Sequence, residues 1–117
     1  MAKQPVIAES KFFADPGSGE RHAVHVRIRL PQARRREASC KVEIRGVTPE
    51  LEIFGEDTMQ ALALAVRFVN NTLALRHKQG WRFYLEESDR RSFAVWRVWG
   101  HSPRLSAFQI PAKVNAA

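Results

Sequence analysis

The sequence contains a single cysteine and no long apolar run in its 117 residues. One cysteine cannot form an intramolecular disulfide, and a chain of this length buries a sufficient core without one. No stretch approaches the roughly 20 apolar residues of a membrane-spanning helix, which excludes integral insertion into a membrane. Residues 1–5 also lack the apolar run of a signal peptide, so we expect one soluble domain in the reducing cytoplasm.

Motifs that carry catalysis or hold a metal are missing as well. His22 and His25 lie three residues apart in an expected strand, so their side chains point to opposite faces and cannot chelate one metal together. His77 and His101 stand alone, and no zinc-ligand spacing occurs. Cys40 alternates in phase with apolar residues, which predicts a buried, inert thiol. We therefore expect a protein that is not an enzyme, and we identify no catalytic residue, metal ligand, cofactor or small-molecule substrate.

Basic residues outnumber acidic ones, because 19 Lys and Arg face 12 Asp and Glu and give a formal net charge of +7. This charge favours acidic partners, with nucleic acid first among them. Arginine supplies most of the basic residues and alanine is frequent, a bias that GC-rich bacterial coding produces without selection for binding. The charge is therefore either a nucleic-acid footprint or a compositional bias.

The first half of the chain alternates apolar and polar residues in the manner of β-strands. A dense turn signal at residues 15–19 predicts a hairpin, a charged connection follows at residues 34–36, and residues 46–49 are a further expected turn. We expect strands over residues 6–15, 22–30 and 40–45, and either a short strand or an extended approach to the helix over residues 51–54.

A helix is expected over residues 58–78. Asp57 followed three residues later by Gln60 matches a capping box, and Gly80 is the expected left-handed terminator. Apolar residues recur at the three- and four-residue spacing of one helical face, and this stripe should pack on the sheet. The stripe consists of Met59, Leu62, Val66, Val69 and Leu73, with Ala65 beside it.

Two more strands are expected after the helix, over residues 81–86 and 93–99, with a turn between them. The order of elements predicts an α+β domain, a mostly antiparallel sheet of five or six strands with one long helix packed on one face. We expect a single domain over residues 1–100 and an irregular C-terminal arm over residues 101–117.

One helix about 10 Å across cannot cover a sheet some 25 Å wide. Curl of the sheet, the C-terminal arm or a second copy must cover the rest, and the last expected strand is largely apolar on both faces. This favours a homodimer or another protein partner. The leading hypothesis is a non-enzymatic protein-interaction module, self-associating or with an accessory role such as an immunity or adaptor protein. Its candidate interface residues are Phe93, Val95, Trp99 and Tyr84.

The sheet face away from the helix supports the alternative hypothesis. Arginine beside aromatic side chains is typical of a sequence-tolerant nucleic-acid platform, in which cations neutralise phosphate and rings stack on bases. A solvated face or a dimer interface uses the same residue types. The candidate nucleic-acid contacts are Arg27, Arg29, Lys41, Arg45 and Arg82.

The segment Gly-Glu-Asp-Thr-Met-Gln-Ala-Leu at residues 55–62, followed by Ala-Leu-Ala, carries a family resemblance. It resembles a family of small uncharacterised bacterial domains that show a Gly-x-Asp-Ser/Thr-x-Gln-Ala-Leu helix start after several N-terminal strands. The resemblance extends from residues 7–9 through the helix. It implies a small bacterial cytosolic α+β protein and carries no catalytic residue, because the family has no assigned activity.

Overall fold

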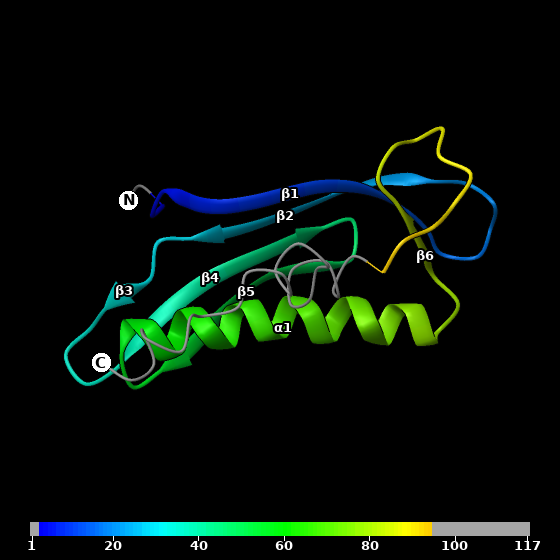
Figure 1. The fold of residues 1–117 in the computed structure, drawn as a ribbon. Coiled ribbons are helices and arrows are strands. Elements are labelled where there is room, and N and C mark those ends of the chain that lie inside the picture. Colours follow the sequence, from blue (N-terminus) through cyan, green and yellow to red (C-terminus); the bar gives the residue numbers. More distant parts are fainter. Residues whose placement is uncertain (1–2, 95–117) are drawn as a thin grey trace, which may run out of the picture.

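The structure, a computed structural model, describes residues 3–94. Six strands and one helix follow one another in this range, which confirms the predicted α+β class (Figure 1). The elements are β1 (Val6–Asp15), β2 (His22–Arg29), β3 (Gln32–Ala33), β4 (Ala38–Arg45), β5 (Thr48–Gly55), α1 (Thr58–Lys78) and β6 (Arg82–Tyr84).

The strands form one antiparallel sheet, as predicted. β5, β4, β2, β1 and β6 lie side by side in that order, and β3 pairs with β4 alongside the end of β2. Short connections join the strands from β1 to β5, whereas α1 carries the chain across the sheet and brings β6 beside β1 (Figure 1). In the described part of the chain, β5 and β6 are therefore the edge strands.

Asp15 closes the first hairpin at the predicted turn. Its carboxylate accepts hydrogen bonds from the backbone N–H groups of Gly17 at 2.8 Å and Gly19 at 3.0 Å, and these bonds lower the pKa of Asp15. Both glycines have a positive φ, which a turn of this kind requires. The resulting register places Phe12 opposite Val24, and both side chains are buried.

The core lies between the sheet and α1. Alternate residues of the central strands point into it, as the predicted strand patterns require. Phe12 on β1 and Phe83 on β6 are buried, and their rings meet edge to face with centroids 5.7 Å apart. From β2 and β4 the core includes Val24, Val26, Ile28, Ala38, Cys40, Val42 and Ile44.

The helix begins and ends where the capping signals predict. The Asp57 carboxylate accepts a hydrogen bond from the backbone N–H of Gln60 at 2.8 Å, and the Gln60 side-chain oxygen accepts one from the backbone N–H of Glu56 at 2.6 Å. Gly80 follows the last turn with φ +102°, the left-handed conformation of a helix terminator.

The buried face of α1 is rotated away from the predicted apolar stripe. Met59 is 76% exposed and Val66 is 37% exposed, so the prediction that these two side chains pack in the core was wrong. Leu62 lies at the margin of the core and is partly buried. The fully buried row consists of Ala61, Ala65, Val69 and Leu73.

Close approach of backbone to backbone explains this rotation. A Cβ placed on Gly55, at the end of β5, would lie 2.6 Å from the backbone nitrogen of Ala61. Small side chains at Ala61 and Ala65 allow the helix to come this near to the sheet, and larger residues at those positions would hold it away. The first half of the helix therefore presents alanines to the strands below, and Val69 and Leu73 follow in the second half.

The helix covers only part of the sheet. It packs chiefly on β4 and β5 and only slightly on β2. The ribbon shows α1 running along the β4–β5 side, with β1 and β2 displaced from it (Figure 1). One helix is therefore too narrow to cover this sheet, as the sequence predicted.

The strands before the helix depart from the predictions in two places. β5 begins directly after Gly46 and Val47, earlier than the predicted turn at residues 46–49 allows, and it includes Pro49. Proline lacks the backbone N–H that a ladder needs, but an edge strand tolerates this loss on its outer side. The two-residue β3 was not predicted.

The strand after the helix is shorter than the predicted range of residues 81–86. β6 ends at Tyr84, and Leu85 is 59% exposed. The strand stops because the Asp89 carboxylate accepts a hydrogen bond from the backbone N–H of Glu86 at 2.9 Å, which closes a local turn in place of the ladder.

The strand predicted over residues 93–99 is described only at its start. Phe93 and Ala94 are not in a strand, although the Phe93 backbone N–H donates to the Phe83 carbonyl at 2.9 Å. Residues 95–99 and the predicted arm over residues 101–117 lie outside the described residues.

We predict that Gly55→Ala lowers the free energy of unfolding by about 1–3 kcal/mol, the usual cost of overpacking. The new Cβ would meet backbone atoms of Ala61, which cannot rotate away as the end of a side chain can. Denaturant unfolding followed by circular dichroism measures the effect. Ser88→Ala, at an exposed turn position, is the control and should leave the midpoint unchanged. An unchanged midpoint for Gly55→Ala would contradict the close contact.

Candidate functional site

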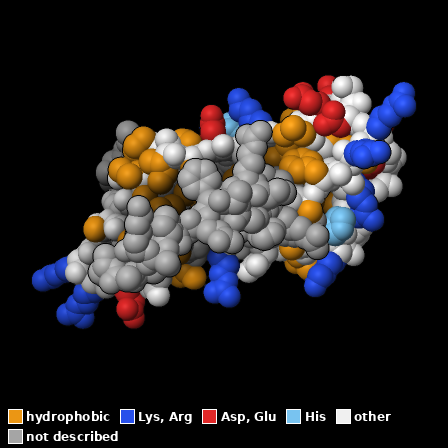
Figure 2. Space-filling view, in the orientation of Figure 1, with side chains coloured by type: hydrophobic (Ala, Val, Ile, Leu, Met, Phe, Trp, Pro, Cys, Tyr) orange, Lys and Arg blue, Asp and Glu red, His pale blue; other side chains and the backbone are white. Residues whose placement is uncertain are grey.

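The sheet face turned away from α1 carries the charged residues expected there. Because side chains alternate along a strand, the neighbours of the buried residues on β2 and β4 point to this open face. Figure 2 shows the opposite side of the molecule, on which α1 lies, and there the visible Lys and Arg side chains lie around the rim. The polar open-face residues of these two strands are His25, Arg27, Arg29, Ser39, Lys41, Glu43 and Arg45.

Three of the five candidate nucleic-acid contacts lie within ion-pair distance of a carboxylate of the same chain. Arg27 and Glu43 are direct cross-strand partners, and Arg27 Nε donates to Glu43 Oε1 at 2.6 Å. Arg45 Nη2 lies 3.9 Å from the other carboxylate oxygen, Glu43 Oε2. Arg29 Nε lies 3.9 Å from Glu50 Oε2, and Arg29 Nη1 donates to the Gln4 carbonyl at 3.0 Å. These arginines are engaged within the domain.

The remaining two candidates lie apart. Lys41 is half-buried on β4 and forms no ion pair within residues 3–94. Arg82, on β6, donates from Nη1 to the Trp81 carbonyl at 2.9 Å and lies 3.4 Å from His77 Nδ1. Arg82 is therefore turned toward the end of α1, and the structure does not bring it together with the candidates on β2 and β4.

Two carboxylates on the open face have lowered pKa values. Partial burial alone would raise the pKa of Glu43, but the hydrogen bond and charge of Arg27 outweigh it, and the net shift is downward. The hydrogen bond from His25, whose Nε2 lies 2.9 Å from Glu9 Oε2, lowers the pKa of Glu9. Both glutamates therefore stay charged at neutral pH, and their negative charges interrupt the positive charge of the open face.

The four candidate interface residues do not form one surface in the described range. Phe93 is partly buried on the core side, with its ring centroid 6.4 Å from that of Phe12. Tyr84 pairs with Phe13 on the opposite face of the sheet, where the Arg21 guanidinium lies 3.4 Å over its ring. Val95 and Trp99 lie outside the described residues.

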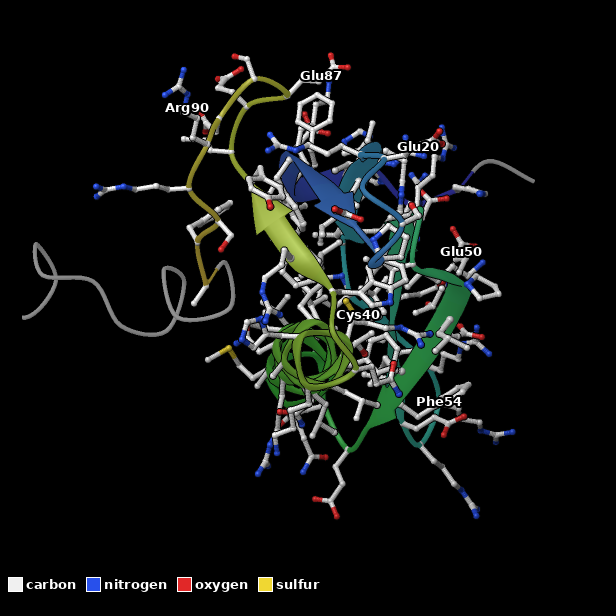
Figure 3. All side chains as sticks on the ribbon, turned by 90° about the vertical axis from the view of Figure 1, so that its right-hand side faces the viewer. Glu20, Cys40, Glu50, Phe54, Glu87 and Arg90 are labelled. Carbon is white, nitrogen blue, oxygen red and sulfur yellow. The ribbon has the colours of Figure 1, made fainter. Side chains whose placement is uncertain are left out.

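The outer edge of β5 was not identified from the sequence. β5 pairs with β4 along one side and with no other strand in residues 3–94. Leu51 is 41% exposed and Phe54 is 46% exposed. Phe54 projects from β5 on the side away from α1 (Figure 3). The alternating residues predicted a short strand here, but only the sheet order reveals that it is an edge.

Hollows border the described sheet on both of its faces. A basic cavity of about 330 Å³ opens on the open face near β3 and the N-terminal segment, and its lining includes Lys3, Arg34 and Lys41. An apolar groove of about 260 Å³ lies between α1 and the β1–β2 pair, and Val66 and Val69 form its helical wall. Val66, one of the two exposed residues of the predicted helical stripe, therefore faces this groove.

Cys40 is 1% exposed, as its alternation with apolar residues predicts. Its thiol donates a hydrogen bond to the Arg29 carbonyl at 3.3 Å. Burial raises the pKa of the Cys40 thiol, which keeps it protonated. Figure 3, viewed nearly along α1, shows Cys40 between the helix and the sheet.

Within residues 3–94, no three His, Cys, Asp or Glu side chains lie close enough together to hold a metal ion. No helix in the same range combines the length and apolar character that crossing a membrane requires.

A family model described as a domain of unknown function, DUF6968, matches residues 10–95. The chain belongs to the DUF6968 family. The match extends from β1 through β6 and includes the helix start at residues 55–62, so the expected membership in a family of uncharacterised domains is confirmed. No curated protein and no solved structure matches the chain.

We predict that Glu43→Gln lowers the free energy of unfolding of this DUF6968 domain by about 1–2 kcal/mol at pH 7, because Arg27 loses a charged partner. The pKa of Glu43 is lowered in the folded chain, so its contribution is present above the ordinary carboxyl value of 4.5. The contribution is lost as the pH falls through the lowered folded value. Denaturant unfolding at several pH values should therefore show the difference from wild type shrinking in acid.

Glu20→Gln is the control for this measurement, because Glu20 is exposed and its side chain forms no ion pair in the described range. It should change stability little at any pH. A Glu43→Gln effect that is the same at neutral and acidic pH would show that the ion pair with Arg27 is not its cause.

We predict that Cys40 reacts with a thiol-specific reagent only when the domain opens. The buried, protonated thiol gives a rate at least 100-fold below that of the unfolded chain, and this rate should rise with denaturant in step with unfolding. The reagent releases an absorbing thiolate when it reacts with Cys40, and the absorbance of this product measures the rate in the native and in the unfolded chain. A native rate close to the unfolded one would contradict burial.

Proposed function

We propose that this DUF6968 domain is a non-enzymatic protein-interaction module that self-associates through the outer edge of β5. The observation that carries the proposal is an eight-residue edge strand, unpaired on its outer side in the described range, that exposes Leu51 and Phe54. An edge strand presents a row of free backbone N–H and C=O groups, which a further strand can pair with.

The two exposed side chains lie on opposite faces of β5. Leu51 pairs in register with Val42, which points into the core, whereas Phe54 pairs with Ser39 on the open face. An added strand would therefore gain apolar contact on both faces as well as backbone hydrogen bonds. Under a two-fold axis the same edge can pair with itself in antiparallel fashion, which makes a second copy the partner of choice.

The acidic residues of β5 do not oppose this pairing strongly. Glu50 Oε2 lies 3.3 Å from Lys3 Nζ, and Glu52 Oε2 lies 2.7 Å from Arg34 Nη2. Each glutamate is thus balanced by a cation of its own chain. Repulsion between two copies of the edge is correspondingly small.

Nucleic-acid binding through the open face is the second candidate. A phosphate there would compete with Glu43 for Arg27 and with Glu50 for Arg29, and this competition places the candidate behind the first. Titration of labelled single- and double-stranded nucleic acid at several salt concentrations tests it. Tight binding that weakens steeply with salt, and less steeply after Arg27 and Arg29 are neutralised, would favour it over self-association.

We further propose that the domain acts in the cytoplasm of a bacterial cell. The resemblance carried by the helix start is to bacterial domains, and Cys40 is a free thiol, the state that a reducing compartment maintains.

We predict that the wild-type domain is a dimer in solution and that the double variant Leu51→Lys with Phe54→Lys is a folded monomer. Two charges on the edge would have to be desolvated on pairing, which should weaken association at least tenfold. Light scattering after size exclusion measures mass, and circular dichroism checks the fold. If the wild-type domain is a monomer at high concentration, the proposed self-association is wrong.

Two single variants locate the interface. Leu85→Lys, at a similarly exposed leucine beyond the opposite edge strand, should leave the dimer intact. Trp99→Lys should also leave it intact. If Trp99→Lys is a monomer and the double variant of β5 is still a dimer, the interface lies in the segment around Trp99 that the sequence predicted, and not at β5.

A further inference from the structure

The basic cavity of about 330 Å³ lies on the open face of the sheet, at the end where β3 pairs with β4. Arg29 fixes the N-terminal segment beside it by donating to the Gln4 carbonyl at 3.0 Å, and the Leu30 backbone N–H donates to the Pro5 carbonyl at 2.8 Å. Leu30, 44% exposed, supplies an apolar wall. The polar lining residues are Lys3, Gln4, Gln32, Arg34, Ser39 and Lys41.

The polar lining is made almost entirely of hydrogen-bond donors. Lysine and arginine side chains have no acceptor, and the glutamine amides and the serine hydroxyl can donate as well. No carboxylate lines the cavity. Glu50 and Glu52 hold Lys3 and Arg34 from β5, which leaves the charge of Lys41 without an ion pair in the described range. A cavity of this composition favours an anion.

Ser39 lines the cavity beside Lys41. The residue is 2% exposed, and it points to the same face as Lys41 because the two positions are two residues apart on β4. Its hydroxyl can donate a hydrogen bond to an oxygen of an anion bound there.

We propose that this cavity binds the phosphate group of a small phosphorylated organic molecule. Phosphate offers several charged oxygens, so it can bind the Lys41 ammonium and the Ser39 hydroxyl and also share Lys3 and Arg34 with the glutamates of β5, which a single carboxylate does less well. The volume is at the lower end of the range for small-molecule sites and exceeds what phosphate alone requires, so an organic substituent fits against Leu30.

Calorimetric titration of the full chain at low salt with ribose 5-phosphate, inorganic phosphate and ribose tests the assignment. Ribose 5-phosphate should bind with a dissociation constant below 1 mM, on the order of small-ligand affinities. Inorganic phosphate should bind more weakly, and ribose should not bind. Absence of binding by both phosphate compounds at millimolar concentration would overturn the proposal, as would equal binding of ribose.

Three variants connect the binding to the cavity. Lys41→Gln should weaken ribose 5-phosphate binding at least tenfold, and Ser39→Ala should weaken it several-fold while thermal unfolding shows that the fold is retained. Arg45→Gln removes an exposed cation from the same strand outside the cavity and should leave affinity unchanged. An equal loss in Arg45→Gln would assign the binding to the general positive charge and overturn the site.

A single-stranded oligonucleotide is the last probe. If it binds more tightly than ribose 5-phosphate and Lys41→Gln weakens both, the cavity receives a backbone phosphate of nucleic acid, and the assignment to a small molecule is overturned. If it binds no more tightly, the small-molecule assignment stands.

Discussion

Contact between backbone and backbone at the junction of β5 and α1 governs how this domain is built. Gly55 and Ala61 meet so closely that a single methyl group does not fit between them. The helix therefore packs on the β4–β5 side of the sheet, where the small side chains of Ala61 and Ala65 allow the close approach. Two consequences follow. Val66 turns outward to an apolar groove beside β1 and β2, and β5 is covered on one face while no strand of residues 3–94 pairs with its outer edge.

Cross-strand ion pairs divide the basic charge of the open face. Arg27 meets Glu43 because the register of β2 and β4 places them opposite each other, and His25 meets Glu9 across β1 and β2. A net charge of +7 therefore does not translate into a continuous positive field. Lys41 and Arg82 are the two cations of the predicted group without an ion pair in residues 3–94, and Lys41 lines the basic cavity together with Ser39.

The proposed interface and the proposed phosphate cavity share structural elements. Lys3 and Arg34 line the cavity, and each is held by a glutamate of β5, the strand whose edge forms the proposed interface. The two ion pairs thus connect one wall of the cavity to the edge strand.

The sequence by itself determined the local elements of this protein. Alternation specified the faces of β2 and β4, and Asp57, Gln60 and Gly80 specified the ends of the helix, because capping and alternation depend on residues a few positions apart. The burial of Cys40 follows from the same alternation. The order of strands, the rotation of α1 and the convergence of Lys3, Ser39 and Lys41 were decided only by the tertiary structure. Each depends on which distant backbones meet, and no local pattern encodes that distance.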